Sequence, residues 1–295
     1  CRYQVAQRFI DMLRLTMPRA KILFNNADLH FLREMRTAVL AGDDDALKSA
    51  LTTREEELAI MRKVDLTLSY NEVEHAIIFT HTAGGAQVAK LPWVVETEAS
   101  PAPFSARADL GFLGGYGHPP NVEAVEFFVG SVMPLLRQTL PGVRFRVFGS
   151  NMPERFKALA AEDVEMVGFV ENLDAVYQSC RLFVAPLLSG AGIKGKVIGA
   201  MAAGIPIVMS PVAAEGTGCR DGFDCRIAET PEGWAEAIAD LYRDEARWRF
   251  IADNAQRFAA EHFSFETGVK TLRRGIEKVD LFPPPSPTAL VALSS

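Results

Sequence analysis

SGAGIKGKVIGAMAAGIPIVMSPVAAEG, residues 189–216, is the stretch that decides the fold. It follows the apolar run RLFVAPLL, and within it a glycine-rich loop leads to the small-residue segment AMAAG and then to the β-branched run IPIVMS. A strand, a loop, a helix and a second strand form a βαβ unit, whose two strands run parallel. The stretch therefore predicts a doubly wound α/β domain, in which ligands bind at the carboxyl ends of the strands.

The glycine loop has the chemistry of an anion site. Gly190 and Gly192 let the backbone approach a ligand without interference from a Cβ atom. The helix that we expect to begin near Lys194 offers unpaired N–H groups and a positive dipole end, and Lys194 and Lys196 add full charge beside them. A diphosphate fits these groups better than a carboxylate does. The alternative is a plain turn with solvated lysines.

Loops after two other predicted strands should reach the same edge of the sheet. Gly114 and Gly115 end the strand DLGFLGG and would let phosphates or a sugar approach, or would simply form a tight turn. His118 precedes two prolines and is a candidate phosphate contact or a turn residue. Glu215 and the N–H of Gly216 are candidates for binding a sugar hydroxyl.

The rest of the chain also alternates strands and helices. KILFN, from Lys21, and VDLTLSY read as strands, Asp43–Asp45 as a helix start and Asn71 as an N-cap. An Ala-, Ser- and Pro-rich stretch, ETEASPAPFSARA, suggests a domain boundary. We expect domains at 1–107 and 108–280, and a disordered Pro-rich tail at 281–295.

Composition excludes several classes of protein. The 295 residues are 48% hydrophobic and 23% charged, with a net charge of −6 and no long Lys/Arg block, so we expect no nucleic-acid partner. No apolar run reaches the roughly eighteen residues of a membrane span. The four cysteines lack metal-ligand spacing, which favours reduced thiols without disulfides in a cytoplasmic protein; they are Cys1, Cys180, Cys219 and Cys225. Because the chain begins at Cys1 rather than Met, we expect a fragment or a processed product.

Four motifs follow one another between residues 109 and 279: GGYGHPPNVEAVEFFVGSVMPLL, VFGSN, GFVENLDAVY and VAPLLSGAGIKGKVIGAMAAGIPIVMSPVAAEG. With them the chain resembles the donor-binding half of GT-B glycosyltransferases, of the kind placed in glycosyltransferase family 4 (group 1). ADLHFLREMRTAVL and REEELAIMRKVDLTLSYNEVE are similar to the later part of the acceptor-side domain. The resemblance implies two Rossmann-like doubly wound domains facing a cleft, the first one incomplete and N-terminally truncated.

The resemblance also implies an activity. It is retaining transfer of a sugar from a nucleotide-diphosphate sugar to an acceptor, with no cofactor and no obligatory metal, because lysines and helix N-termini neutralise the charge that grows on the diphosphate. Lys194 and Lys196 are the catalytic candidates, Ile193 lies in the donor loop, and Phe169 and Val170 would lie near the nucleobase or form a core-facing strand end. The acceptor, a glycan, a lipid-linked group or a protein, stays unidentified, and peripheral association with a membrane is compatible with this class.

His30 is the candidate catalytic residue of the first domain. It follows the KILFN strand, at the edge that would face the cleft, where it would contact the donor sugar or the acceptor. The alternative is a capping or packing histidine.

Two positions depart from the family pattern. Where the family commonly has Lys-x-x-Glu-Ala, with a glutamate that binds the ribose hydroxyls, this chain has Gly199, and Leu188 stands where an arginine is common. The alternative to an enzyme is therefore a degenerate, non-catalytic protein that binds nucleotide sugars or is a structural remnant.

Overall fold

The computed structural model describes residues 3–91 and 93–281, which form two compact units. The first takes the described residues up to Leu91 and those from Glu266 onward, and the second takes Trp93–Phe265. The division lies near position 92 rather than at 107, because the segment between them is bonded to the second unit: Val95 N–H donates to Phe263 O and Glu98 N–H to Ala202 O, each at 2.9 Å. The predicted tail lies outside the described residues, apart from Leu281.

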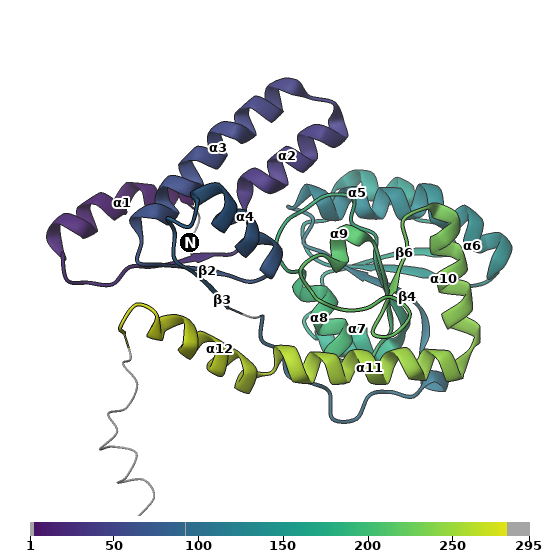
Figure 1. Cartoon of the computed structure of the whole chain (residues 1–295). Helices are drawn as coiled ribbons and strands as arrows, with labels where there is room; N and C mark the ends of the chain where they lie inside the picture. Colours follow the sequence, from purple (N-terminus) through teal and green to yellow (C-terminus); the bar gives the residue numbers. More distant parts are fainter. Residues whose placement is uncertain (1–2, 92, 282–295) are drawn as a thin grey trace, which may run out of the picture. The chain divides into compact units, whose positions relative to one another are not determined.

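The first unit is a three-stranded parallel sheet in the order β1-β2-β3, with helices around it (Figure 1). Its strands are β1 Leu23–Asn26, β2 Leu66–Ser69 and β3 Val88–Lys90, and its helices are α1 Tyr3–Thr16, α2 His30–Ala41, α3 Asp44–Lys63, α4 Glu72–Thr82 and α12 Phe265–Glu277. The predicted helix starts at Asp43 and Asn71 are confirmed. Gly42 ends α2 in the left-handed region, Asp43 caps α3, and the Asn71 side chain accepts a hydrogen bond from Glu74 N.

The last helix of the chain returns to this first unit. Leu272 and Ile276 of α12 pack on a small cluster that includes Leu66, Leu68 and Ala89. At Gly275 the helix comes so close to β3 that a Cβ atom would lie 2.8 Å from the Ala89 Cβ. The helix that follows Ser264 therefore belongs to the first unit, although it comes after the second unit in sequence.

The second unit is a six-stranded parallel sheet in the order β6-β5-β4-β7-β8-β9. Its strands are β4 Ala108–Leu113, β5 Phe145–Phe148, β6 Val164–Gly168, β7 Cys180–Ala185, β8 Ile207–Met209 and β9 Arg226–Ile227. Its helices are α5 Pro119–Phe127, α6 Met133–Thr139, α7 Leu173–Ser179, α8 Gly195–Ala202, α9 Pro211–Ala214, α10 Pro231–Arg243 and α11 Glu245–Phe263. The predicted α/β class with parallel sheets is confirmed.

Helices cover both faces of this sheet: α5, α6 and α10 lie on one face, and α7, α8 and α11 on the other (Figure 1). The central strands are therefore apolar along their whole length, as in Leu182–Ala185, all of them buried. Strand order reverses between β4 and β7, so the loops after these two strands lie on either side of the switch point.

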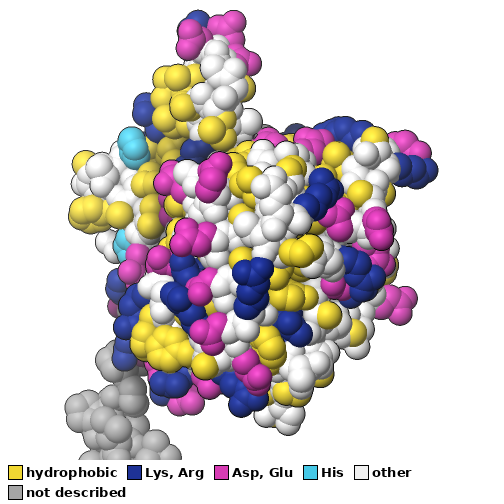
Figure 2. All heavy atoms as spheres, turned by 90° about the vertical axis from the view of Figure 1, so that its right-hand side faces the viewer, with side chains coloured by type: hydrophobic (Ala, Val, Ile, Leu, Met, Phe, Trp, Pro, Cys, Tyr) yellow, Lys and Arg dark blue, Asp and Glu magenta, His cyan; other side chains and the backbone are white. Residues whose placement is uncertain are grey.

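Two helical segments of the second unit are irregular. The segment after Pro119 is interrupted by a π-helical turn at Phe128–Val132, just before Pro134, which has no N–H to donate to the preceding turn. The segment PERFKALA forms a 3₁₀ turn, Glu154–Leu159. Figure 2 shows Lys and Arg side chains interspersed with Asp and Glu over the face in view.

Candidate functional site

The loops that carry most of the predicted residues meet at the carboxyl edge of the second sheet. Gly114 and Gly115 directly follow β4, and the glycine loop follows β7 and leads into α8. The segment with Glu215 and Gly216 follows β8 and α9. Because all six strands are parallel, these loops share one edge, and the first two are neighbours at the switch point.

The loop after β4 is held by a close approach of two backbones. Gly149, after β5, has φ 131°, and a Cβ atom there would lie 1.6 Å from Gly114 O. Only glycine allows this approach. The Asn121 side chain then folds back from α5, and its Nδ2 donates to Gly115 O at 2.8 Å. His118 occupies the N-cap position of α5, where its side chain makes no capping hydrogen bond.

Lys196 is a half-buried cation, and its partners are uncharged. Its Nζ donates to Asn121 Oδ1 at 2.5 Å and lies 4.4 Å from the centre of the Phe112 ring. Burial, together with the nearby charge of Lys194, lowers the pKa of Lys196 to about 7. Since neither the amide nor the ring neutralises the ammonium charge, this position favours an incoming anion.

Lys194 has a different environment from Lys196. It is the N-cap residue of α8, its side chain is buried, and its Nζ donates to Gly192 O at 2.5 Å and to Ala191 O at 3.2 Å. Gly190 adopts φ 133°, which favours glycine, whereas a Cβ atom there would make only ordinary contact with Lys194 Cε, at 3.6 Å. The glycine loop is therefore wrapped around the Lys194 ammonium group, a structural role that the spacing alone did not predict.

A cavity of about 660 Å³ adjoins the start of α8. Lys196 and Gly199 of α8, Tyr177 of α7 and the segment after Trp93 line it. A Cβ atom at Gly199 would lie 2.9 Å from Tyr177 Oη, so the space beside this glycine is filled by the tyrosine hydroxyl. A Cβ atom at Gly195 would meet the Trp93 ring at 2.7 Å. Both glycines of α8 thus allow aromatic side chains to pack closely against the helix.

The other predicted donor residues lie around this edge in varied settings. Phe169, after β6, has 71% of its surface exposed, which rules out the core-facing alternative for its side chain. Val170 and Ile193 are half-buried and pack on the main core. Glu215 ends α9, and Gly216 adopts φ 75°, in the left-handed region that favours glycine.

His30 belongs to the first unit and begins α2. Its Nδ1 lies 2.8 Å from Oε1 of Glu57, a fully buried carboxylate that also accepts hydrogen bonds from the backbone N–H groups of His30 and Phe31. The hydrogen bond with Glu57 raises the pKa of His30, which favours the imidazolium form. These contacts account for His30 as a residue at a capped helix start; a contact between His30 and a donor sugar stays a prediction.

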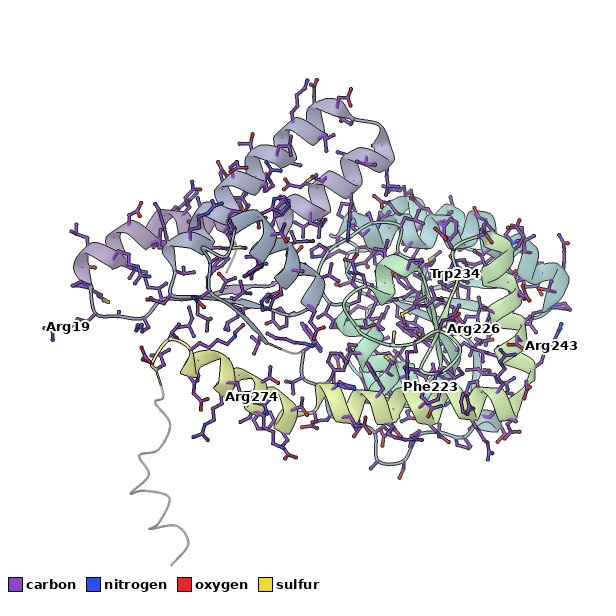
Figure 3. The ribbon with its side chains drawn as sticks, viewed as in Figure 1. Arg19, Phe223, Arg226, Trp234, Arg243 and Arg274 are labelled. Atoms are coloured by element: carbon purple, nitrogen blue, oxygen red, sulfur yellow. The ribbon has the colours of Figure 1, made fainter. Side chains whose placement is uncertain are left out.

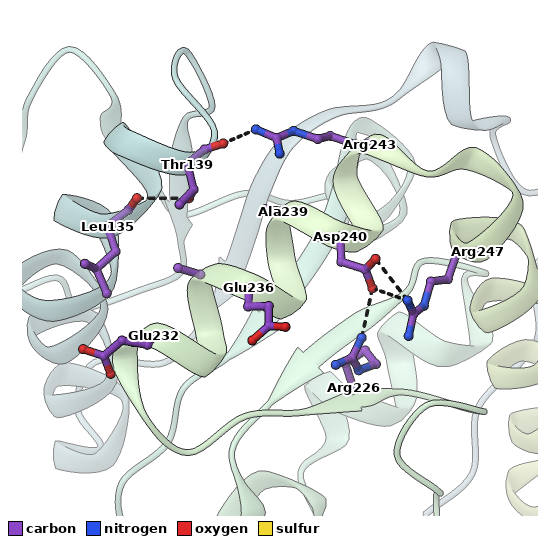
Figure 4. A pocket seen from close by; sticks show the side chains of 10 residues that line it. Leu135, Thr139, Arg226, Glu232, Glu236, Ala239, Asp240, Arg243 and Arg247 are labelled. Atoms are coloured by element: carbon purple, nitrogen blue, oxygen red, sulfur yellow. Dashed lines mark hydrogen bonds and ion pairs between the residues drawn. The ribbon is translucent and has the colours of Figure 1, made fainter.

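A second cavity, of about 530 Å³, lies between α6 and α10 (Figure 4). Four of its charged side chains bind one another or the backbone: Asp240 pairs with Arg226 and Arg247, and Arg243 donates to Thr139 O. None of the predicted site residues lines it. Among residues 3–91 and 93–281, no group of three or more His, Cys, Asp or Glu side chains could hold a metal ion, and no helix is long and apolar enough to cross a membrane.

Sequence reasoning missed Asn121, Phe112 and Tyr177, which surround Lys196 and Gly199. Asn121 lies 75 positions from Lys196 in the chain, and the pairing arises only when β4 and β7 become neighbours. Its position directly after two prolines that open a helix was the available signal.

Part of the chain is similar in sequence to known proteins. Residues 107–244 match the model of the family described as Glycosyl transferases group 1. A Klebsiella pneumoniae protein described as an uncharacterized 44.6 kDa protein in the cps region is 26% identical over 161 residues, which cover 52% of this chain and 42% of that protein. Phosphatidyl-myo-inositol mannosyltransferase of Mycobacterium leprae (strain TN) is 26% identical over 178 residues, which cover 57% of this chain and 46% of that protein. Each match spans less than half of the relative.

Solved structures of glycosyltransferases are similar over nearly the whole chain. A TarM mutant of S. aureus, in complex with fondaparinux, alpha-GlcNAc-glycerol and UDP, has a TM-score of 0.75 at 14% identity, over 92% of this chain and 53% of that one. Sucrose-phosphate synthase of Thermosynechococcus elongatus has a TM-score of 0.75 at 17% identity, over 94% of this chain and 72% of that one. Anabaena HepE, in complex with UDP and glucose, has a TM-score of 0.68 at 14% identity, over 95% of this chain and 76% of that one. These likenesses confirm the predicted fold class, two Rossmann-like domains of GT-B type.

Proposed function

We propose that this chain, whose residues 107–244 form a domain of the Glycosyl transferases group 1 family, moves a sugar from a nucleotide-diphosphate sugar to an acceptor with retention of configuration and without a metal. The observation that carries the proposal is the anion site at the carboxyl edge of the second sheet. There the N-terminus of α8 and the Lys196 ammonium group lie beside a glycine-rich loop.

The chemistry of transfer fits these groups. When the bond between the sugar and the diphosphate breaks, negative charge grows on the leaving phosphate oxygens. The Lys196 ammonium, which its amide and aromatic partners leave without a counter-charge, would stabilise that charge together with the N–H groups at the start of α8. Lys194 would act indirectly, by holding the shape of the loop through its bonds to Ala191 O and Gly192 O. We propose a cytoplasmic location for the reaction, with the free thiols of the three cysteines that the structure describes as support.

One observation favours a competing function, nucleotide-sugar binding without turnover. Gly199 stands where related enzymes commonly carry a glutamate, and Tyr177 Oη occupies the adjoining space. A carboxylate that accepts hydrogen bonds from a ribose diol contributes on the order of 1.5 to 3 kcal/mol, so its absence would weaken donor binding by roughly tenfold to a hundredfold. Both functions need the diphosphate site, and they differ only in turnover.

Binding is tested by calorimetry with UDP and with uridine. We expect Lys196→Met to weaken UDP binding by more than about tenfold and to leave uridine binding unchanged, because only phosphate interacts with the lost charge. The matched control is Lys157→Met, which removes an equal charge from an exposed side chain. Equal losses for UDP and uridine would contradict the phosphate assignment.

Turnover is tested separately, by incubating the chain with UDP-glucose and following the released UDP and the anomeric proton of the product by NMR. Transfer or hydrolysis that keeps the α configuration and persists in EDTA supports the retaining, metal-independent enzyme. UDP binding without any UDP release from UDP-glucose or from other nucleotide sugars supports the binding protein.

A further inference from the structure

Two thiols face each other in the loop between α9 and β9. The Cys225 thiol donates a hydrogen bond to the Cys219 sulfur, and the two Sγ atoms are 3.4 Å apart. Figure 3 labels Phe223, which lies on this loop, and Arg226, which follows it. Neither thiol belongs to the anion site described above. Formation of a disulfide bond would require the sulfur atoms to approach to about 2.05 Å.

The backbone holds the two cysteines together without any bond between their sulfur atoms. Gly222 N–H donates to Cys225 O at 2.8 Å, and Asp224 Oδ2 accepts from Arg220 N at 2.9 Å. Asp221 Oδ1 accepts from Ile227 N at 2.8 Å, which ties the loop to β9. The loop is thus a folded turn in the reduced state, and the short distance between the thiols is built into it.

The two thiols differ in reactivity. Donation from Cys225, and a contact with the Thr217 hydroxyl at 2.9 Å, lower the pKa of Cys219, whereas the bond to Cys219 and burial raise the pKa of Cys225. Cys219 is also partly exposed, while Cys225 is buried. Gly218 and Arg220, the neighbours of Cys219 in sequence, line a cavity of about 430 Å³. Cys219 is therefore the thiol that a small oxidant reaches and the better nucleophile at neutral pH.

We propose that Cys219 and Cys225 form a redox-active dithiol, which hydrogen peroxide converts to an intramolecular disulfide. In the first step the Cys219 thiolate attacks a peroxide oxygen, the O–O bond breaks, and sulfenic acid and water form once the hydroxide has taken up a proton. In the second step the Cys225 sulfur attacks the sulfenic sulfur, and the hydroxyl group leaves as water with the remaining proton. Two thiols lose two electrons and two protons, and one peroxide yields two waters. This proposal is independent of the proposed transferase activity.

Cys180 supplies an internal control. It is fully buried at the start of β7, and burial raises the pKa of its thiol. A Cβ atom at Gly111 would lie 2.7 Å from its sulfur, which shows how tightly the thiol is enclosed. We therefore expect Cys180 to react with iodoacetamide in the folded chain at least about tenfold more slowly than Cys219.

The test is treatment of the reduced full-length chain with one equivalent of hydrogen peroxide, followed by alkylation in denaturant and peptide mass spectrometry. We expect a peptide that has lost two hydrogens, with Cys219 linked to Cys225 and Cys180 still alkylated, and dithiothreitol should restore both thiols. Oxidation of Cys219 to sulfinic or sulfonic acid while Cys225 remains a free thiol would overturn the proposal. A disulfide that links either residue to Cys1 or Cys180 would overturn it as well.

Two variants separate the steps. In Cys225→Ser the resolving thiol is absent, so the Cys219 sulfenic acid should persist and be trapped by dimedone. In Cys219→Ser the buried Cys225 should be oxidised at least about tenfold more slowly than Cys219 is in the unmodified chain. Equal oxidation rates for Cys219 and Cys225 in the two variants would contradict the assignment of Cys219 as the reactive thiol.

Discussion

At the scale of single residues, Lys196 gives the site a dependence on pH. The pKa of about 7 means that the ammonium form dominates at pH 6 and the neutral amine at pH 8.5. A diphosphate binds the ammonium form better, so we expect the affinity for UDP-glucose to fall by up to roughly thirtyfold between these two pH values. UDP-glucose is the right ligand, because its diphosphate does not ionise in this range. Calorimetry across the range measures the effect, and Lys196→Met should show a flat profile.

The lowered pKa of Lys196 also makes stability depend on pH. The free energy of unfolding should rise with pH, whereas the affinity for UDP-glucose should fall. In the unfolded chain Lys196 holds its proton up to about pH 10.5, whereas in the folded chain it releases it near pH 7. Between these values the unfolded state binds more protons, so the free energy of unfolding should rise with pH relative to Lys196→Met. Urea unfolding at pH 6.5 and pH 9.5 checks this. A difference between the two proteins that stays constant with pH would contradict the shifted pKa.

Gly199 is the second residue whose role can be decided by substitution. Because a Cβ atom there would lie 2.9 Å from Tyr177 Oη, we expect Gly199→Ala to lose about 1 kcal/mol of stability, overpacking outweighing the gain in helix propensity. In a Tyr177→Phe background the hydroxyl is gone, and the ring carbon atoms at 3.4 Å and 3.5 Å allow ordinary contact. There the same substitution should stabilise by up to about 1 kcal/mol. Stabilisation in both backgrounds would indicate a vacant ribose site rather than close packing.

At the scale of elements, the approach of the loops after β4 and β5 depends on one glycine. Gly149 has φ 131°, and a Cβ atom would lie 1.6 Å from Gly114 O, so Gly149→Ala should cost at least about 3 kcal/mol. Gly142→Ala is the matched control, because Gly142 also has a positive φ, 85°, but faces open space. The control should lose only the roughly 1 to 2 kcal/mol of backbone strain. If denaturant unfolding gave equal losses of stability for Gly149→Ala and Gly142→Ala, backbone strain alone would explain the need for glycine at position 149.

The sequence predicts elements better than it predicts side-chain partners. Asp43 and Asn71 mark helix starts through local backbone chemistry, and the structure has these starts where the sequence predicts them. Lys194 was predicted as a free charge, but its side chain turns back onto its own loop, a choice of rotamer that no periodicity encodes. His30 lies 27 positions from Glu57, so its partner depends on how α2 and α3 pack. The loops that carry the candidate site residues could be placed at one edge of the sheet from the sequence, whereas the hydrogen bonds of these residues depend on the fold.

At the scale of the whole molecule, the first unit is made from both ends of the chain. The described residues before position 92 supply its sheet, and α12, which follows the second unit in sequence, closes its small cluster around Leu66, Leu68 and Ala89. The sequence marked only one domain boundary, the stretch rich in Ala, Ser and Pro. Composition can indicate such a linker, but it does not show that a later helix packs on the first unit. Stability of the first unit therefore depends on residues more than 170 positions from β3.

Packing of α12 on β3 can be tested at Gly275, where a Cβ atom would lie 2.8 Å from the Ala89 Cβ. We expect Gly275→Val to push the helix away from the sheet and to destabilise the first unit by about 1 to 3 kcal/mol. Hydrogen exchange resolves the effect by unit: amides of β2 and β3 should exchange faster, while those of β4 and β7 should be unchanged. Arg274→Val, at the exposed neighbouring position labelled in Figure 3, controls for a β-branched residue on the same helix and should leave β2 and β3 protected. Faster exchange in β4 and β7 as well would mean that the two units unfold together, and that α12 stabilises more than the unit it packs on.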